Sequence, residues 1–180
     1  MKIIFTFFII ILCIDFTSAQ FISNSVYFTS QNTGYTVGVD WTNSDNLIFK
    51  TTNGGINWEI QQTVGNCILY SVYFPDSLTG HAVGENWAAG GGVIMKTTDG
   101  GNSWDYQLNG NASTFKSVYF INTDIGFAVG DDYFQGNRII KTTNGGIDWH
   151  DQTSGIVEGL NSVFFININT GYCEYWHVGF

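Results

Sequence analysis

Aromatic residues recur beside carboxylates in three equivalent places along the chain. Each of the three aromatics stands three residues after a glycine, with one or two acidic residues close by. Aromatic rings and carboxylates together suit the binding of sugars, peptides or basic protein patches. The alternative is that the rings only fill the gap to a neighbouring structural unit. The candidate binding residues are Asp40, Trp41, Glu85, Trp87, Asp131, Asp132 and Tyr133.

Catalytic and metal-binding patterns are scarce. The sequence has no HExxH, GxSxG or phosphate-loop motif, and its three histidines do not cluster, so we expect them to be packed or surface residues. Cys67 and Cys173 belong to no CxxC pair, which disfavours zinc. We expect both to be buried as small hydrophobic residues, and whether they pair stays open. The sequence therefore predicts no catalytic residue, no metal and no cofactor.

Internal repetition shows what must position the candidate residues. The tetrapeptide SVYF begins at Ser25, Ser71 and Ser117, and its near copy SVFF begins at Ser162. A period of 45 to 46 residues is typical of a propeller blade or of a helical pair. The units consist of short runs of Val, Ile, Phe, Tyr and Thr separated by Gly and Asn, which is the composition of strands and turns. This composition favours the propeller.

Each unit divides into four expected strands. In the first unit they are residues 25–28, 35–37, 47–52 and 58–62, and glycines flank the second strand of each complete unit. Four antiparallel strands per unit predict an all-β fold, an incomplete β-propeller of about three and a half blades. The blades are expected at about 25–70, 71–116 and 117–161, with a partial blade at 162–180, all within a repeat region of 20–180. Such an array leaves open blade edges, so we expect either a longer gene product or self-association.

A turn sequence closes the third and fourth strands of each unit. It reads KTTNGGINW from Lys50, KTTDGGNSW from Lys96 and KTTNGGIDW from Lys141. Asn-Gly and Asp-Gly favour tight primed turns with positive φ, and we expect the tryptophan to fold back over the turn. Three copies, two of them with Asn in place of Asp, indicate a structural rather than a catalytic motif, because an amide cannot act as a general base.

These turns resemble the Asp-box (BNR-like repeat) of bacterial sialidases, sortilin-type receptors and the photosystem II assembly factor family. The resemblance implies a propeller in which the box is a structural turn remote from the binding face. The residues that fill its positions are Thr51, Asn53, Gly55, Trp58, Thr97, Asp99, Gly101, Trp104, Thr142, Asn144, Gly146 and Trp149.

The resemblance does not by itself imply an activity. A sialidase-like site uses three arginines, and this sequence contains only Arg138. Propeller endoglucanases use two aspartates across a cleft between two propellers, whereas only part of one propeller is present here. Photosystem assembly members present an arginine-rich face that this chain lacks. We therefore expect a non-catalytic module for protein or glycan binding or assembly; the alternative is a fragment of a carbohydrate-active hydrolase.

The N-terminus and the charge indicate where the protein acts. Residues 1–19 combine Lys2, a short apolar run and small residues before the expected cut, which predicts a signal peptide and a secreted, periplasmic or cell-surface protein. No other segment is apolar enough for membrane insertion. The net charge of −9 disfavours nucleic acid as a partner, because a phosphate backbone repels an acidic surface.

Overall fold

The computed structural model describes the repeat region of the protein almost throughout. The described residues are 21–40, 45–110, 113–134, 136–153, 155 and 158–175. The expected signal peptide at residues 1–19 and the candidate binding residue Trp41 lie outside them. Every regular element in these ranges is a β-strand. Within the same ranges no helix is long and apolar enough to cross a membrane.

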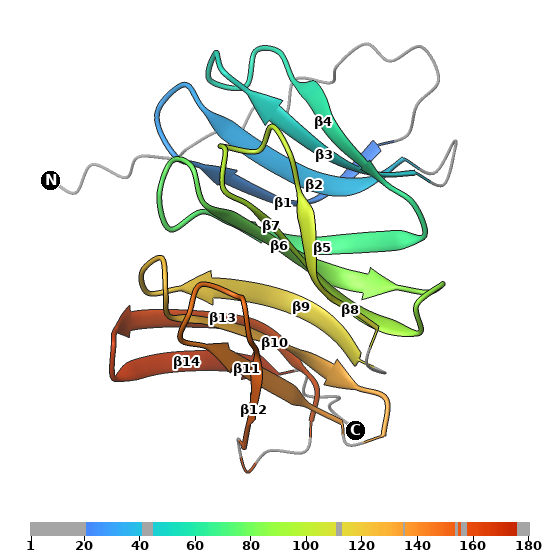
Figure 1. Ribbon diagram of the computed structural model, residues 1–180, viewed down its shortest axis with the longest axis vertical. Coiled ribbons are helices and arrows are strands. Elements are labelled where there is room, and N and C mark those ends of the chain that lie inside the picture. The colour runs from blue at the N-terminus through green and yellow to red at the C-terminus, as the bar shows by residue number, and fades with distance from the viewer. Residues whose placement is uncertain are drawn as a thin grey trace, which may run out of the picture.

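The strands form four antiparallel sheets in chain order, in which each strand pairs with its sequence neighbours. Figure 1 shows the sheets following one another from blade 1, in blue and teal at the top, to the red strands of the partial blade below. Blade 1 comprises β1 (Phe21–Phe28), β2 (Gly34–Asp40), β3 (Asp45–Thr51) and β4 (Glu59–Val64). Blade 2 comprises β5 (Cys67–Tyr73), β6 (Gly80–Asn86), β7 (Gly91–Thr97) and β8 (Asp105–Asn109). Blade 3 comprises β9 (Ser113–Phe120), β10 (Gly126–Asp132), β11 (Arg138–Thr142) and β12 (His150–Gln152), and the partial blade comprises β13 (Leu160–Asn167) and β14 (Thr170–Tyr175).

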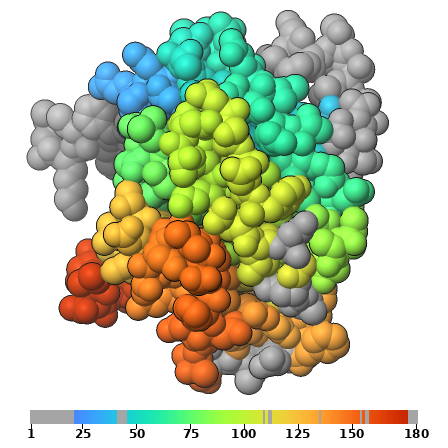
Figure 2. All heavy atoms as spheres, viewed as in Figure 1, coloured from blue at the N-terminus to red at the C-terminus, as the bar shows by residue number. Residues whose placement is uncertain are grey.

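The first strand of each blade lies beside the first strand of the next, as in a propeller. Contacts join β1 to β5, β5 to β9 and β9 to β13, so these strands form the inner edge of the array. The filled surface in Figure 2 shows the same progression from the first blade to the last. The expected fold class, an all-β incomplete propeller, is therefore confirmed.

A β-bulge interrupts each inner strand at the residue before the SVYF serine. In blade 2, Leu69 pairs with Gly84 and Ser71 with Val83, which leaves Tyr70 as the extra residue. The bulge brings a backbone carbonyl close to the second strand, because a Cβ on Gly84 would lie only 1.8 Å from the Ile68 carbonyl oxygen. In the equivalent bulges the extra residue is Asn24 in β1, Lys116 in β9 and Asn161 in β13.

The serine of the repeated tetrapeptide connects successive inner strands. Its hydroxyl oxygen accepts a hydrogen bond from the valine amide of the next blade, at 3.2 Å from Val72 to Ser25 and 3.4 Å from Val118 to Ser71. The third link, from Val163 to Ser117, measures 3.3 Å. These bonds satisfy amides of inner strands, each of which has a strand neighbour on one side only in its sheet. The serine spacing is therefore a spacing between blades.

Stacked rings fill the space between neighbouring blades. A ring from the second strand of one blade stacks on the tetrapeptide phenylalanine of the next, with centroids 3.9 Å apart for Tyr35 and Phe74 and 3.8 Å apart for His81 and Phe120. Tyr35 also donates a hydrogen bond to the Gly100 carbonyl oxygen in the turn of blade 2. The interface between blades 1 and 2 therefore combines apolar burial with a polar contact from the stacked ring to the next turn.

The repeat turns are seven-residue connections between the third and fourth strands. The prediction of a primed turn at Asn-Gly is wrong. In blade 1 the positive φ angles fall on Gly54 and Gly55, at 73° and 89°, and not on Asn53. Asn53 Oδ1 instead accepts the Asn57 amide hydrogen at 2.9 Å, while Thr51 Oγ1 accepts the Gly55 amide hydrogen at 2.9 Å. An oxygen that caps backbone amides does not need a left-handed residue, since the adjacent glycines supply that conformation.

Each of the three turn tryptophans packs edge to face on the tetrapeptide phenylalanine of its own blade. Trp104 is buried and meets Phe74 edge to face, with ring centroids 5.8 Å apart. Cys67 is buried, whereas Cys173 is exposed, so the expectation that both are buried is wrong for Cys173. It lies on β14, which has β13 as its only strand neighbour among the described residues and hence little cover. The two sulfurs are not bonded to each other.

Candidate functional site

The candidate site is built around Glu85, at the end of β6. Both of its carboxylate oxygens accept hydrogen bonds, from the Tyr70 hydroxyl to Oε1 at 2.7 Å and from the Thr114 hydroxyl to Oε2 at 2.8 Å. Burial by itself would raise the pKa of Glu85, but these hydrogen bonds outweigh it and hold the pKa below its ordinary value. Glu85 is therefore a fixed negative charge near neutral pH.

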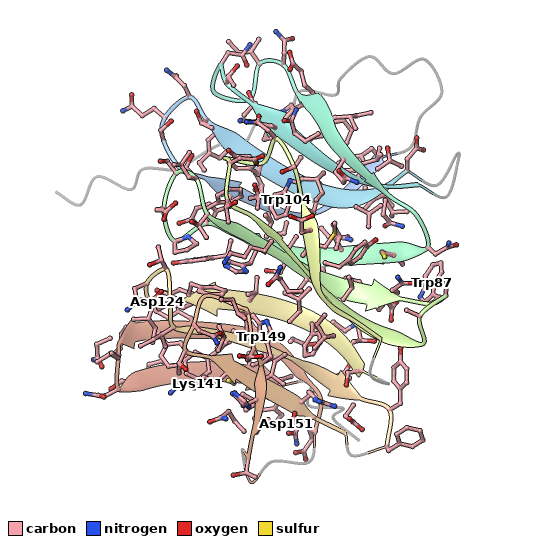
Figure 3. All side chains as sticks on the ribbon, in the orientation of Figure 1. Trp87, Trp104, Asp124, Lys141, Trp149 and Asp151 are labelled. Atoms are coloured by element: carbon pink, nitrogen blue, oxygen red, sulfur yellow. The ribbon has the colours of Figure 1, made fainter. Side chains whose placement is uncertain are left out.

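Two exposed rings from consecutive blades converge on this carboxylate. The Trp87 side chain helps to lower the pKa of Glu85, and the Tyr133 hydroxyl lies 3.3 Å from the Thr114 hydroxyl. Trp87 is 57% exposed and Tyr133 is 56% exposed, so most of each ring faces solvent. Figure 3 shows Trp87 beyond the strand ends, whereas Trp104 and Trp149 lie among the strands. At these two positions the rings are mainly surface residues rather than filling between blades.

Asp131, at the end of β10, is a second carboxylate of the cluster. Burial raises its pKa, the Glu85 charge adds to the rise, and the Lys116 ammonium opposes it. Lys116 Nζ lies 4.2 Å from the centroid of the Tyr70 ring. We call Tyr70, Glu85, Trp87, Thr114, Lys116, Asp131 and Tyr133 the Glu85 cluster.

The structure places the other two described candidates differently. Asp40 and Asp132 are both buried at the ends of β2 and β10. Asp132 Oδ1 accepts the Phe134 amide hydrogen at 2.9 Å, and its other oxygen lies 3.3 Å from Arg138 Nη1. Both carboxylates are therefore shielded from solvent and do not line the exposed surface.

Sequence reasoning missed four residues of this surface. Tyr70 and Lys116 are bulge residues that lie in phase before the SVYF serine, so their 46-residue spacing was a usable signal. Thr114 carried no such signal, because its role depends on the packing of β9 against β6. Phe134, which follows Tyr133, is 86% exposed and extends the aromatic surface.

A hollow lies outside the Glu85 cluster. It measures about 230 Å³ and is lined mainly by apolar residues of blade 3 and the partial blade, among them Val129, Ile139 and Phe165. None of its lining residues belongs to the Glu85 cluster, so it does not extend that cluster. Within the described ranges no group of three or more His, Cys, Asp and Glu residues is arranged to hold a metal ion.

The Glu85 cluster has the features of a recognition surface rather than of a proton-transfer site. Exposed rings offer flat faces for a sugar or an apolar side chain, and Glu85 contributes a negative charge between them. The hydrogen bonds from Tyr70 and Thr114 hold Glu85 as a carboxylate, so it is poorly suited to release a proton as a general acid. The arrangement therefore favours recognition.

Comparison with solved structures shows propellers. The chain resembles YCF48 bound to a D1 peptide, with a TM-score of 0.58 and 20% identity over 82% of this chain and 48% of that one. It also resembles the GH74 enzyme of Niastella koreensis, with a TM-score of 0.60 and 18% identity over 77% of this chain and 25% of the enzyme. The GH74 xyloglucanase of Xanthomonas campestris gives a TM-score of 0.55 and 11% identity over 72% and 21% of the two chains.

At these identities the likeness establishes the propeller fold alone. The chain spans about half the length of YCF48 and about a quarter or less of the two enzymes. No family model matches the sequence, and no curated protein matches it.

Proposed function

We propose that the protein is a non-catalytic propeller module that binds a protein or glycan ligand at the Glu85 cluster. It acts in the secreted, periplasmic or cell-surface space to which the expected signal peptide would direct it. The repeat turns are Asp-box turns of the kind found in photosystem II assembly factors and sialidases, and they serve the fold.

One observation carries the proposal: two half-exposed rings, Trp87 and Tyr133, stand on consecutive blades around the Glu85 charge. Exposed aromatic rings at a fixed spacing are a common feature of binding surfaces, because they give a large contact area at little entropic cost. YCF48, which has a similar fold, was solved with a peptide bound, so the propeller fold is compatible with peptide recognition.

An array of glycans and of basic and neutral peptides tests the proposal. The intact protein should bind one ligand class, and the double variant Trp87→Ala/Tyr133→Ala should lose that signal. Leu78→Ala is the matched control, since Leu78 is 58% exposed but lies before β6, at the opposite end of that strand from Glu85. Equal binding by the double variant would place the ligand elsewhere.

A carbohydrate-active hydrolase is the second candidate, and one observation favours it. The pKa of Asp131 is raised and that of neighbouring Glu85 is lowered, which is the pattern of an acid and its partner carboxylate in glycosidases. Release of reducing ends from xyloglucan or another β-glucan, abolished by Asp131→Asn, would support a hydrolase. We expect no release.

We also propose that the chain associates with itself through open blade edges. The side chains Val26 and Phe28 of β1 and Phe164 and Tyr172 of the partial blade are large, apolar and exposed. Exposed apolar edges of this kind promote association.

A further inference from the structure

We infer that the outer face of β1 in one copy packs on the outer face of β14 in a second copy, with Phe28 stacked on Tyr172. The inference rests on the self-association proposed above and names the two faces that meet. It is independent of ligand binding at the Glu85 cluster.

The three interfaces inside the chain supply the template. In each one, the residue after the first glycine of the second strand stacks on the tetrapeptide phenylalanine of the following blade. The three pairs are Tyr35 with Phe74, His81 with Phe120, and Phe127 with Phe165, at centroid distances of 3.9, 3.8 and 4.4 Å. The three interfaces therefore repeat one pairing. One blade supplies the face with the second-strand ring, called here the donor face, and the next blade supplies the face with the tetrapeptide phenylalanine, called here the acceptor face.

Blade 1 presents an acceptor face that the described residues leave uncovered. Val26 and Phe28 are 54% and 43% exposed, whereas their equivalents in blade 2, Val72 and Phe74, are 3% and 2% exposed. The same side chains that form the core of blade 2 are therefore at the surface of blade 1.

The partial blade presents the matching donor face. Tyr172 follows Gly171 as Tyr35 follows Gly34, and it is 61% exposed whereas Tyr35 is 1% exposed. Tyr35 donates its hydroxyl hydrogen to the Gly100 carbonyl oxygen at 2.7 Å. Tyr172 can make the same bond to Gly54 of a second copy, because Gly54 occupies in the blade 1 turn the position of Gly100 in blade 2.

Two further rows of contacts continue across the same junction. The rings of Tyr27, Tyr73, Tyr119 and Phe164 form one row along the inner strands, with neighbouring centroids 4.9, 4.9 and 5.5 Å apart. Phe164 at one end of the row would meet Tyr27 of the second copy. Ser162 would accept the Val26 amide hydrogen, as Ser117 accepts that of Val163. The junction therefore extends an interface that the chain already makes three times.

A second copy is the occupant that these features specify, since its own two faces are the complementary ones. A head-to-tail contact either closes a ring or grows into a filament. Each copy fills four blade positions, because the partial blade takes a position of its own in the array, so two copies joined in this way fill eight positions, which lies within the range of closed propellers. The contact should therefore close as a two-copy ring.

Analytical ultracentrifugation combined with cross-linking tests the inference. The purified protein should sediment as a dimer. Phe28→Glu should raise the dissociation constant of the dimer by about 100-fold or more, as loss of a central aromatic contact does. Ile147→Glu is the matched control, because Ile147 is equally apolar and 70% exposed but lies on a repeat turn away from both faces. Melting curves should show that both variants remain folded.

Cross-linking identifies the faces. In a Cys173→Ser background, copies carrying Phe28→Cys are mixed with copies carrying Tyr172→Cys and treated with a short bismaleimide. A mixed cross-linked dimer supports the inference. A dimer without this cross-link overturns the assignment of faces but not self-association, whereas a monomer at tens of micromolar overturns both, and larger linear assemblies with the cross-link overturn the closed ring.

Discussion

Lys96 in blade 2 donates a hydrogen bond from Nζ to the Gly145 carbonyl oxygen in blade 3, at 2.8 Å. Lys50 makes the same contact to Gly100 at 2.7 Å. The lysine that opens the repeat turn in blades 1 and 2 therefore holds the turn of the following blade. The charged hydrogen bond of this lysine orders the array, whereas composition alone would suggest that the lysine is a solvated surface charge.

Lys96→Met should lower the free energy of unfolding by about 1.5 to 3 kcal/mol, because the bond has a charged donor and its loss leaves a carbonyl without that partner. Lys141→Met is the matched control. Lys141 lies 5.4 Å from the Phe127 ring, and the described residues include no turn of a following blade for it to hold. Urea unfolding measures both variants, and an equal loss would show that the turn contact adds nothing.

The turn caps give a second prediction. Asn53→Ala should cost about 1 kcal/mol of stability, because the Asn57 amide loses its acceptor. Asn144→Ala should cost a similar amount through the Asp148 amide. Asn57→Ala serves as control, since it keeps the backbone N–H that Asn53 caps. Unchanged stability of both capping variants would contradict the structural role of the turns, as would a loss of ligand binding at unchanged stability.

Repeats, strand number and turn positions followed from the sequence because each leaves a local pattern. The bulge did not, although the buried residues Leu69, Val72 and Phe74 are spaced three and then two apart, which breaks the alternation of a regular strand. The sequence also named Glu85, Trp87 and Tyr133 as candidates, and their role in binding stays a prediction. It could not show that Tyr70 and Thr114 would occupy both Glu85 oxygens, since that depends on how two blades pack together.

The bulge makes Gly84 irreplaceable. Gly84→Ala should cost about 2 to 3 kcal/mol, because its Cβ would overlap the Ile68 carbonyl oxygen and the backbone would have to move. Gly65→Ala is the control, as nothing lies within 4 Å of its added Cβ. Chemical denaturation of the two variants should separate them clearly, and equal midpoints would mean that the bulge adapts freely.

Buried His81 should make stability depend on pH. Burial and the nearby Lys96 charge lower its pKa to about 3, with Asp76 opposing, and within the described residues neither ring nitrogen has a hydrogen-bond partner. The unfolded chain therefore binds a proton below about pH 6.5 that the folded chain refuses until about pH 3. The contribution of neutral, buried His81 to the free energy of unfolding is therefore fully present above pH 6.5. It is lost as the pH falls, at no more than about 1.4 kcal/mol per pH unit.

His81→Phe should flatten that dependence, since Phe127 fills the equivalent position of blade 3. The exposed His150 provides the comparison, and His150→Gln should leave the slope unchanged. Thermal melts between pH 4 and pH 7.5 measure both. A parent slope that persists in His81→Phe would assign the acid sensitivity to other groups.

Calorimetric titration of the best array ligand tests the central claim most directly. If the Glu85 cluster is a binding site, Trp87→Ala should raise the dissociation constant by about 10-fold or more, as loss of an exposed aromatic anchor does. The melting temperature should stay within a few degrees of the parent's. Leu78→Ala should bind as the parent does. Unchanged affinity of Trp87→Ala for that ligand, in a folded protein, would contradict the account.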